Sequence, residues 1–425
     1  MALATEAPKD GFRLSMLIYD TRFRSMTIQI IVLILVMLGV SWLIHNLIIN
    51  LAAKGKDLSF GFLFNRAGYD IDQQLIPYTN DSTHGRAAIV GLLNTLLVAG
   101  LACFFATILG VVVGVLRLSK NWLVARLMTV YIEVFRNVPL LLWIILTYVV
   151  LSEVMPEPRD FKITDEMIAA GQAPKASMLI DSSIAVTNRG TNIPSILLSR
   201  PLGGVDIGPL SLNFSFLAAA VVIIASLLAN RALLRNAKRV QEATGNRPTT
   251  WWKSILILFA PIILLFWAMG FHLEYPVFRT FNFQGGLNVS HALTSLLIAL
   301  TIYSATYIAE AVRAGILAIS RGQSEAAFAL GMRPGRTMSL IILPQALRVI
   351  IPPLISQYLN ITKNTSLGIA VGYLDLRGTL GGITLNQTGR ELECMLLMML
   401  IYLILSLIIS SVMNVFNNAV KLKER

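Results

Sequence analysis

Two acid–base pairs occupy similar positions beside long apolar runs. Glu133 and Arg136, in Y-I-E-V-F-R, and Glu310 and Arg313, in Y-I-A-E-A-V-R, are each three positions apart, about one helical turn. Ionisable groups at membrane depth are costly and often functional. Two interpretations stay open: local pairing with snorkelling at the membrane surface, or a clamp that holds a cytoplasmic loop to the helix bundle during gating.

The other residues with chemical potential do not form a catalytic or metal site in the sequence. The four histidines are scattered without an H-E-x-x-H pair, and no G-x-x-x-x-G-K-[ST] phosphate loop occurs. Cys103 and Cys394 both lie in apolar runs and give neither a disulfide framework nor a metal-ligand spacing. The sequence therefore predicts a protein that is not an enzyme and that binds no metal or cofactor of its own.

The composition indicates which elements must position these residues. Of 425 residues, 55% are hydrophobic and only 14% are charged, whereas soluble proteins carry about 25% charged residues. Uncharged runs of about 18 residues or more are membrane-span candidates. The runs predict about eight helical spans, at 26–51, 87–116, 128–152, 212–230, 254–272, 289–316, 340–361 and 394–418. The predicted fold class is an all-α polytopic, multi-pass membrane protein in the lipid bilayer.

The net charge of +12 is interpreted as membrane orientation rather than nucleic-acid binding, because Lys and Arg accumulate in cytoplasmic loops. The basic loops fall on one side of the predicted spans, which places both termini in the cytoplasm. The first apolar run is too long for a secretory signal and is predicted to be a retained anchor. The long loop from 152 to 211, rich in turn residues, is predicted to be structureless and extracytoplasmic.

A short basic segment separates the sixth and seventh spans: S-E-A-A-F-A-L-G-M-R-P-G-R-T-M-S-L-I-I-L-P. Ser320 and Gln323 fit a capping box, and Glu325 is expected in the first helical turn. Gly331 can end a helix in the left-handed conformation, and Pro334 prevents its continuation. These features predict a short cytoplasmic helix. It is either an ordinary capped loop helix or a knob that docks in a groove of a soluble partner.

The spacing within this segment resembles the EAA loop of ABC importer membrane subunits. In that family the loop is the coupling helix that fits into a cleft of the ATPase subunit. The matching positions are Glu325, Ala326, Ala327, Gly331, Ile341, Leu343 and Pro344.

Three other stretches, Tyr131–Ile144, Tyr307–Gln323 and Lys363–Leu376, resemble the polar amino-acid branch of these importers. The architecture is similar to the longer Q-type subunit of general L-amino-acid importers and of glutamate, glutamine, aspartate and asparagine importers. The predicted organisation has four parts: an N-terminal segment with the anchor and first outer loop (1–86), the first part of the permease core (87–152), an insertion with two extra spans (153–288), and the second part of the core with the EAA loop (289–425).

The resemblance implies the transmembrane fold of a type I ABC importer and a permease subunit for polar L-amino acids in a bacterial inner membrane. It also implies a separate cytosolic ATPase that uses the ATP, a second homologous permease in a heterodimer, and an extracytoplasmic solute-binding protein, with no nucleic acid. The alternatives are an ion-coupled secondary amino-acid transporter, which typically needs acids or broken helices near the midplane, and a structural or channel subunit.

An amino acid carries a carboxylate and an ammonium group, so its pathway needs polar groups within the bundle. The candidates for that pathway are Asn94, Thr95, Thr301, Ser304, Gln357, Asn360, Lys363, Asn364 and Thr365. Any of them can instead form hydrogen bonds between helices. Pro139 and Pro344 permit kinks in apolar helices, which serve either packing or a hinge.

Overall fold

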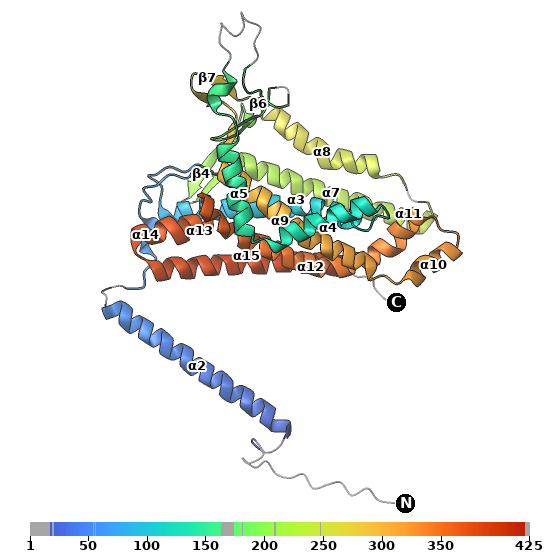
Figure 1. Cartoon of the computed structure of the whole chain (residues 1–425), viewed down its shortest axis with the longest axis horizontal. Helices are drawn as coiled ribbons and strands as arrows, with labels where there is room; N and C mark the ends of the chain where they lie inside the picture. The colour runs from blue at the N-terminus through green and yellow to red at the C-terminus, as the bar shows by residue number, and fades with distance from the viewer. Residues whose placement is uncertain are drawn as a thin grey trace, which may run out of the picture. The chain divides into compact units, whose positions relative to one another are not determined.

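The computed structural model describes residues 18, 21–53, 55, 57–162, 174–180, 182–207, 210–246 and 248–420. The chain divides into two compact units, Met1–Phe60 and Gly61–Arg425. The first contains α2 (Thr21–Ala53), drawn in blue in Figure 1. Its apolar side chains are exposed along the whole helix. This exposure is expected of the predicted anchor, since a lone span contacts lipid on every side.

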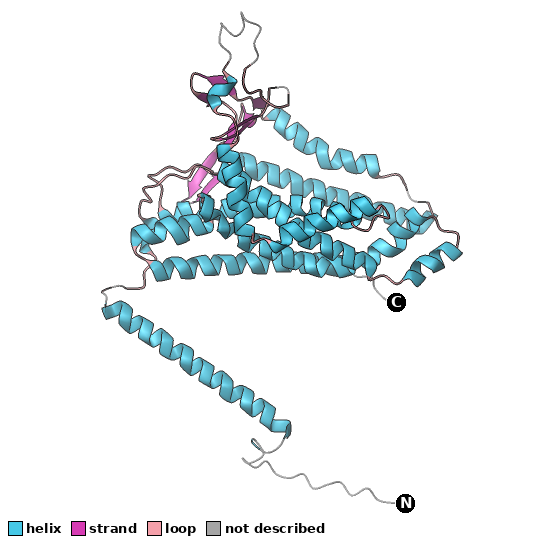
Figure 2. Cartoon of the chain, viewed as in Figure 1, coloured by secondary structure: helices cyan, strands magenta, loops and turns pink. Residues whose placement is uncertain are grey.

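The second unit is built mainly of helices (Figures 1 and 2). Its longer helices are α3 (His84–Leu116), α4 (Trp122–Asn137), α5 (Leu140–Glu153), α7 (Phe214–Thr244), α8 (Trp251–Ala268), α9 (His291–Leu317), α12 (Leu343–Asn364) and α15 (Glu391–Val420). Among the described residues of the whole chain, seven helices are long and apolar enough to span a membrane, or eight if the bent pair α4 and α5 counts as one. The predicted all-α polytopic class and its number of spans are confirmed.

The predicted third span, 128–152, is not one continuous helix. It starts earlier, at Trp122, and breaks between α4 and α5 with a bend of 101°. The break occurs because Pro139 has no backbone N–H and disfavours the helical conformation at the residue before it. Val138 is accordingly extended, with φ −100° and ψ 134°.

Helix α9 lies at the centre of the unit and packs against α3, α5 and α12. Its buried residues include Leu296, Leu300 and Ile308, which share one apolar core with residues of α3, α5 and α12. Close contact with α3 depends on glycine: a Cβ atom added at Gly110 would lie 2.6 Å from Cβ of Ile308. Small residues let membrane helices approach closely and pack by van der Waals contact.

The long loop that was expected to be structureless contains short strands in its described part (magenta in Figure 2). The strands that precede α7 are β1 (Ala185–Thr187), β2 (Gly190–Ile193), β3 (Ser195–Leu198), β4 (Gly204–Ile207) and β5 (Leu210–Asn213). Those that follow α8 are β6 (Phe271–Glu274), β7 (Val277–Arg279), β8 (Asn282–Gln284) and β9 (Leu287–Val289).

Antiparallel pairing joins the two strand-bearing segments across the α7–α8 hairpin. Strand β2 pairs with both β1 and β9, with Thr191 opposite Val289. Strand β3 pairs with β6, with Ser195 opposite Glu274. The segment 153–288, the predicted insertion, is therefore closed at its base, and the turn between β1 and β2 is fixed beside the start of α9. Residues 163–173, 181, 208 and 209 of the predicted loop lie outside the described residues.

Short helical pieces complete the unit. They are η1 (Gly61–Phe64), η2 (Pro158–Phe161), α10 (Arg321–Ala329), α11 (Pro334–Thr337), the π-helical turn η3 (Met338–Ile342), η4 (Thr365–Val371), α13 (Leu376–Gly378), the π-helical turn η5 (Thr379–Thr384) and α14 (Leu385–Thr388). The pieces after α12 pack on α3 and α15.

Candidate coupling segment, charge cluster and substrate pathway

The EAA-like segment forms the predicted short helix, α10, but its start differs from the prediction. The expected capping box is absent: Ser320 is the N-cap, and its side chain accepts no hydrogen bond from the helix. The backbone makes the first turn instead, with the Gln323 amide donating to the Ser320 carbonyl at 3.1 Å. Glu325 lies beyond the first turn, contrary to expectation. The capping pattern permits these side-chain bonds without selecting the rotamers that make them.

The end of α10 follows the sequence prediction. Gly331 has φ +73°, the left-handed conformation that favours glycine. The Met332 amide donates to the Ala327 carbonyl at 3.1 Å, and the Gly331 amide donates to the Phe328 carbonyl at 2.9 Å. Pro334 is then the first residue of α11. The result is a short helix, a tight turn and a new start that leads into α12.

The motif residues divide between a packed side and an exposed side. Ala327 is buried, which allows α10 to rest on α11 and η3. Glu325 and Ala326 are exposed. Of the positions nearer α12, Leu343 is exposed, and Ile341 and Pro344 are half-buried.

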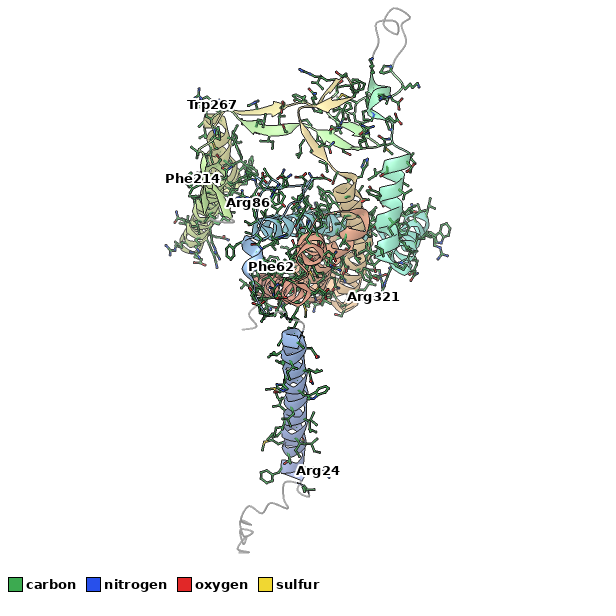
Figure 3. All side chains as sticks on the ribbon, turned by 90° about the vertical axis from the view of Figure 1, so that its left-hand side faces the viewer. Arg24, Phe62, Arg86, Phe214, Trp267 and Arg321 are labelled. Atoms are coloured by element: carbon green, nitrogen blue, oxygen red, sulfur yellow. The ribbon has the colours of Figure 1, made fainter. Side chains whose placement is uncertain are left out.

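Two apolar side chains project from the same segment. Phe328 is 49% exposed and Leu330 is 82% exposed. Figure 3 marks Arg321 at the start of this helix. An exposed apolar pair on a short helix that packs against α11 and η3 is suited to docking in a partner's groove.

The two acid–base pairs behave differently. Glu310 and Arg313 form the predicted pair, with 3.0 Å between Oε2 and Nε. Glu133 and Arg136 are not ion-paired: Glu133 accepts a hydrogen bond from Asn137 Nδ2 at 3.1 Å, and Arg136 lies over the ring of Tyr307 at 5.1 Å.

A residue that was not predicted completes the charge cluster. Arg117, at the end of α3, is ion-paired with the same Glu310 carboxylate. Burial and the positive charge of Arg313 lower the pKa of the Arg117 guanidinium, while Glu133 raises it. The cluster joins the ends of α3 and α9, and among the described residues no ion pair or hydrogen bond joins it to α10. The role of the four predicted residues as a clamp on the EAA loop stays a prediction.

The first two pathway candidates make contacts within the fold. Asn94 donates from Nδ2 to the carbonyls of Gln73 and Leu374 at 2.7 and 2.9 Å, and its Oδ1 is buried with no partner among the described residues. Thr95 donates to Gly91 and accepts from the Leu376 amide. Asn94 therefore fastens α3 to Leu374, and Thr95 fastens it to the start of α13.

The other candidates lie in separate environments. Thr301 borders an apolar pocket of about 520 Å³ between α3 and α9, and Ser304 is buried in α9. Thr365 is buried and donates to the Thr362 carbonyl. Asn360 and Lys363 are exposed, while Gln357 and Asn364 are half-buried. The nine candidates do not converge on one cavity, and their role with substrate stays a prediction.

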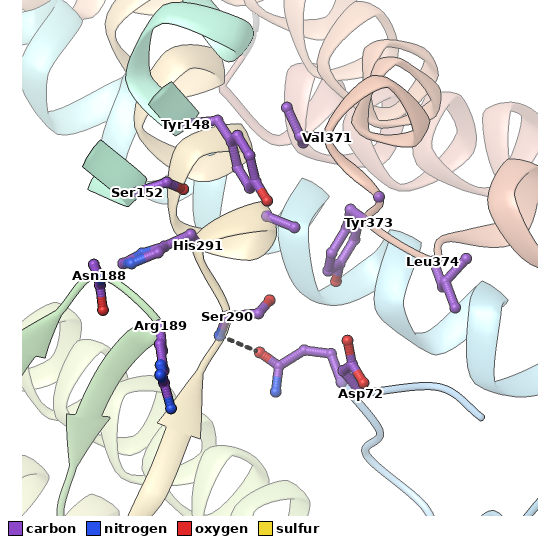
Figure 4. A pocket seen from close by; sticks show the side chains of 13 residues that line it. Asp72, Tyr148, Ser152, Asn188, Arg189, Ser290, His291, Val371, Tyr373 and Leu374 are labelled. Carbon is purple, nitrogen blue, oxygen red and sulfur yellow. Dashed lines mark hydrogen bonds between the residues drawn. The ribbon is translucent and has the colours of Figure 1, made fainter. Parts of the chain in front are cut away.

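A polar pocket of about 370 Å³ lies at the end of the bundle where α9 begins (Figure 4). Residues from separate segments line it, including Asp72, Gln73, Tyr148, Arg189, Ser290 and His291. None of the nine pathway candidates is among the lining residues. Sequence reasoning missed this site because its residues come from loops that only the strand pairing and helix packing bring together.

Comparison with known proteins identifies the family. A family model described as "Binding-protein-dependent transport system inner membrane component" matches residues 247–422. The chain is 66% identical to the glutamate/glutamine/aspartate/asparagine transport system permease protein BztB of Rhodobacter capsulatus over 100% of both chains. It is 42% identical to the general L-amino acid transport system permease protein AapQ of Rhizobium johnstonii, over 98% of this chain and 96% of that one.

Among solved structures, a chain of an amino acid ABC transporter crystallised with histidines is 18% identical, with a TM-score of 0.42 over 79% of this chain and 95% of that chain. This structural likeness is too distant to carry weight, and the sequence relatives decide the assignment. The chain therefore belongs to the permease subunits of amino-acid ABC transporters.

Proposed function

We propose that this permease conducts glutamate, glutamine, aspartate and asparagine across a bacterial inner membrane, powered by a separate cytosolic ATPase. The substrate class is supported by BztB, the relative whose printed name gives these four amino acids. The membrane assignment is supported by the family description and by the seven or eight apolar spans of the described residues. The relatives give no support to an ion-coupled transporter.

A second permease and a binding protein complete the proposed assembly. The chain is 38% identical to the permease BztC of R. capsulatus over 27% of this chain and 25% of that one, which supports a homologous partner subunit and hence a heterodimer. The phrase "binding-protein-dependent" in the family description supports delivery of substrate by an extracytoplasmic solute-binding protein. In this proposal the ATPase subunit binds the ATP, since the permease sequence contains no phosphate-loop motif.

The observation that carries the proposal is the construction of α10. Phe328 of the helix and its C-cap Leu330 are exposed, and Ala327 is buried where the helix packs on α11 and η3, which lead into α12. On the other side, only a short turn separates α10 from α9. A partner that binds α10 and moves it therefore also moves α9 and α12.

In this mechanism, closure of the ATPase subunits moves α10, and α9 and α12 move with it. The pathway alternates between inward-facing and outward-facing states because the ATPase contacts α10 differently in each state. Only such differential contact can shift a conformational equilibrium. The permease makes and breaks no covalent bond.

Co-purification with the ATPase tests this role. The detergent-solubilised chain is mixed with its candidate ATPase, and wild type is compared with Glu325→Lys and Gly331→Asp. Glu325 is exposed, so its charge reversal changes the docking surface and leaves the core intact. At Gly331 the added side chain meets nothing within 4 Å but is strained by the positive φ. We expect the wild-type chain to retain the ATPase and both variants to lose it.

The matched control is Glu242→Lys, a charge reversal at another exposed glutamate, near the end of α7. This variant should retain the ATPase as wild type does. If the ATPase associates equally with all four proteins, α10 is not the coupling element. If no ATPase associates and an ion gradient alone drives amino-acid transport by the reconstituted chain, the proposed function is wrong.

A further inference from the structure

The polar pocket beside the start of α9 has walls from five parts of the chain, including α5 and the segment between η4 and α13; the other three supply the residues that matter most here. The first outer loop supplies Asp72 and Gln73, the β1–β2 turn of the insertion supplies Arg189, and the start of α9 supplies Ser290 and His291. The Ser290 amide donates to Gln73 Oε1 at 3.3 Å and so joins two of these walls (Figure 4). At about 370 Å³ the pocket is within the range of small-molecule sites.

The β1–β2 turn is held firmly in place as a wall. The Asn188 amide donates to the Pro156 carbonyl at 2.9 Å, and Thr187 Oγ1 donates to the Gly190 carbonyl at 2.9 Å. His291, which is 5% exposed, lies 2.7 Å through Nε2 from the Thr187 carbonyl. These bonds hold the turn beside α9, and Arg189 in the turn lines the pocket.

Two polar atoms of this wall lack a partner among the described residues. A carbonyl only accepts hydrogen bonds, so Nε2 of His291 carries the proton in that contact. In the neutral ring Nδ1 is then an acceptor, yet it is buried with no partner among the described residues. Asn188 Oδ1, a second acceptor in the lining, is in the same condition. Buried acceptors without donors are costly, which favours a ligand or ordered water with N–H or O–H groups at this wall.

Two residues of opposite charge, Asp72 and Arg189, line the pocket. Asp72 and Arg189 lie on either side of the Gln73–Ser290 hydrogen bond (Figure 4), and neither forms an ion pair with any described residue. Arg189 offers a planar set of donors that matches a carboxylate. The amino end of the long helix α9 also favours negative charge. Asp72 offers an acceptor for an ammonium group.

Asn94 of α3 lies behind the pocket and is hydrogen-bonded to three of its lining residues. This buried side chain donates to the carbonyls of Gln73 and Leu374, both of which line the pocket. The hydroxyl of Tyr373, another lining residue, donates to the Asn94 carbonyl at 3.1 Å. These bonds fasten one wall of the pocket to helix α3.

We propose that this pocket binds the main-chain groups of a free amino acid, with Arg189 on the α-carboxylate and Asp72 on the α-ammonium. The inference rests on the proposed function, and it assigns the insertion a direct part in substrate binding. By the predicted orientation the pocket is extracytoplasmic, so it receives the amino acid from the binding protein before the amino acid enters the bundle.

Direct binding to the assembled permease complex tests the site. The complex is placed in lipid nanodiscs without binding protein or ATP, and binding of radiolabelled L-glutamine is measured by scintillation proximity. Arg189→Gln and Asp72→Asn should each raise Kd at least about tenfold, as expected when a hydrogen bond to a charged group is lost. Arg189→Lys retains the charge and should recover part of the affinity. Wild-type Kd in both neutral variants would overturn the proposal.

Two exposed residues outside the pocket provide matched controls. Arg200→Gln alters the same insertion, and Asp70→Asn alters the same outer loop. Both should bind as wild type does. A loss in the controls equal to that in the pocket variants would show a general effect of surface charge and would overturn the assignment.

A ligand analogue separates contact from indirect effects. L-Glutamine amide lacks the α-carboxylate, so wild type should bind it at least about tenfold more weakly than L-glutamine, whereas Arg189→Gln should bind the two equally. If Arg189→Gln still discriminates as wild type does, Arg189 does not contact the carboxylate.

ATP-driven uptake into proteoliposomes with binding protein is measured in parallel. Normal wild-type uptake without L-glutamine binding in the nanodiscs would overturn the pocket and leave the proposed function standing. Absence of uptake would count against the proposed function, whereas the nanodisc measurement still decides the pocket.

Discussion

Helices α8 and α9 are both apolar enough to span a membrane, yet they have opposite surroundings. Helix α8 is the more hydrophobic of the two, but none of its residues is buried. In α9, 56% of the residues in its most apolar 18-residue stretch are buried. The burial inside the protein is therefore not set by hydrophobicity.

The difference lies in the size and polarity of the side chains. Helix α8 is dominated by large apolar residues, including Leu264 and Trp267, which suit contact with lipid. Helix α9 alternates such residues with small and hydroxyl-bearing ones, including Ser295, Ser304 and Thr306, all of them buried. Because lipid tails are as apolar as leucine, helices associate in membranes through close packing and hydrogen bonds rather than through hydrophobic burial.

The most severe break in this comparison is expected from Gly110→Leu. The new side chain would enter the space of Ile308 and the Ala305 carbonyl, which lie 2.6 and 2.9 Å from the position of its Cβ. Overpacking of this kind forces backbone shifts, so we expect no folded protein to be recovered. Recovery is measured by size-exclusion chromatography in detergent. Gly100→Leu on the same helix, where nothing lies within 4 Å, should elute as wild type.

A leucine truncation compares the two helices directly. Leu300→Ala removes a fully buried side chain of α9 and should lower the free energy of unfolding by about 3 kcal/mol. Leu264→Ala on α8, where the side chain is 62% exposed, should change it by less than about 0.5 kcal/mol. Reversible unfolding by sodium dodecyl sulfate in mixed micelles measures both. Equal losses would mean that α8 is packed against a protein surface rather than against lipid or detergent.

The charge cluster at the end of α9 predicts a smaller effect. Glu310→Gln leaves Arg117 and Arg313 without their shared partner in a partly buried place, so we expect a loss of about 2 kcal/mol, below that of a fully buried pair. The control is Glu242→Gln, which breaks an exposed pair with Lys238 and should cost less than about 0.5 kcal/mol. The same unfolding titration applies. A cost at Glu310 no larger than at Glu242 would show that the cluster does not join α3 to α9.

The smallest expected effect concerns helix starts. Thr83 caps α3 by accepting a hydrogen bond from the Arg86 amide at 3.2 Å, so Thr83→Ala should cost about 1 kcal/mol. Ser320 makes no such bond at the start of α10, and Ser320→Ala should cost less than about 0.3 kcal/mol. Unfolding titrations on the two variants check the contrast. A larger cost at Ser320 would restore the capping box that the sequence predicted.

The spans were predictable because each depends on the local run of side chains. The end of α10 was predictable for the same reason, since Gly331 and Pro334 act on their own backbone. The bend after α4 was only partly predictable: Pro139 indicated a kink, but its angle depends on how α4 and α5 each pack on α9. The strands were missed because they are short and because β2 and β3 pair with β9 and β6, which lie beyond α7 and α8 in the sequence.

The candidate sites show the same division. The EAA-like segment was found because its residues are consecutive or nearly so. The pairing of Glu310 with Arg313 was expected from their spacing, whereas Arg117 comes from another helix and had no local signal. The polar pocket was missed entirely, since its residues come from loops far apart in the sequence.

By itself, the sequence determined that the chain is a polytopic helical membrane protein with a short EAA-like helix between two of its spans. Those properties follow from the free energy of transfer into lipid and from backbone conformations, and both act on neighbouring residues. The tertiary structure alone decided which spans are central, which arginine shares Glu310, and that Arg189 of the insertion borders the same pocket as Asp72. These outcomes depend on close packing and on strand pairing between distant segments, which no local pattern encodes.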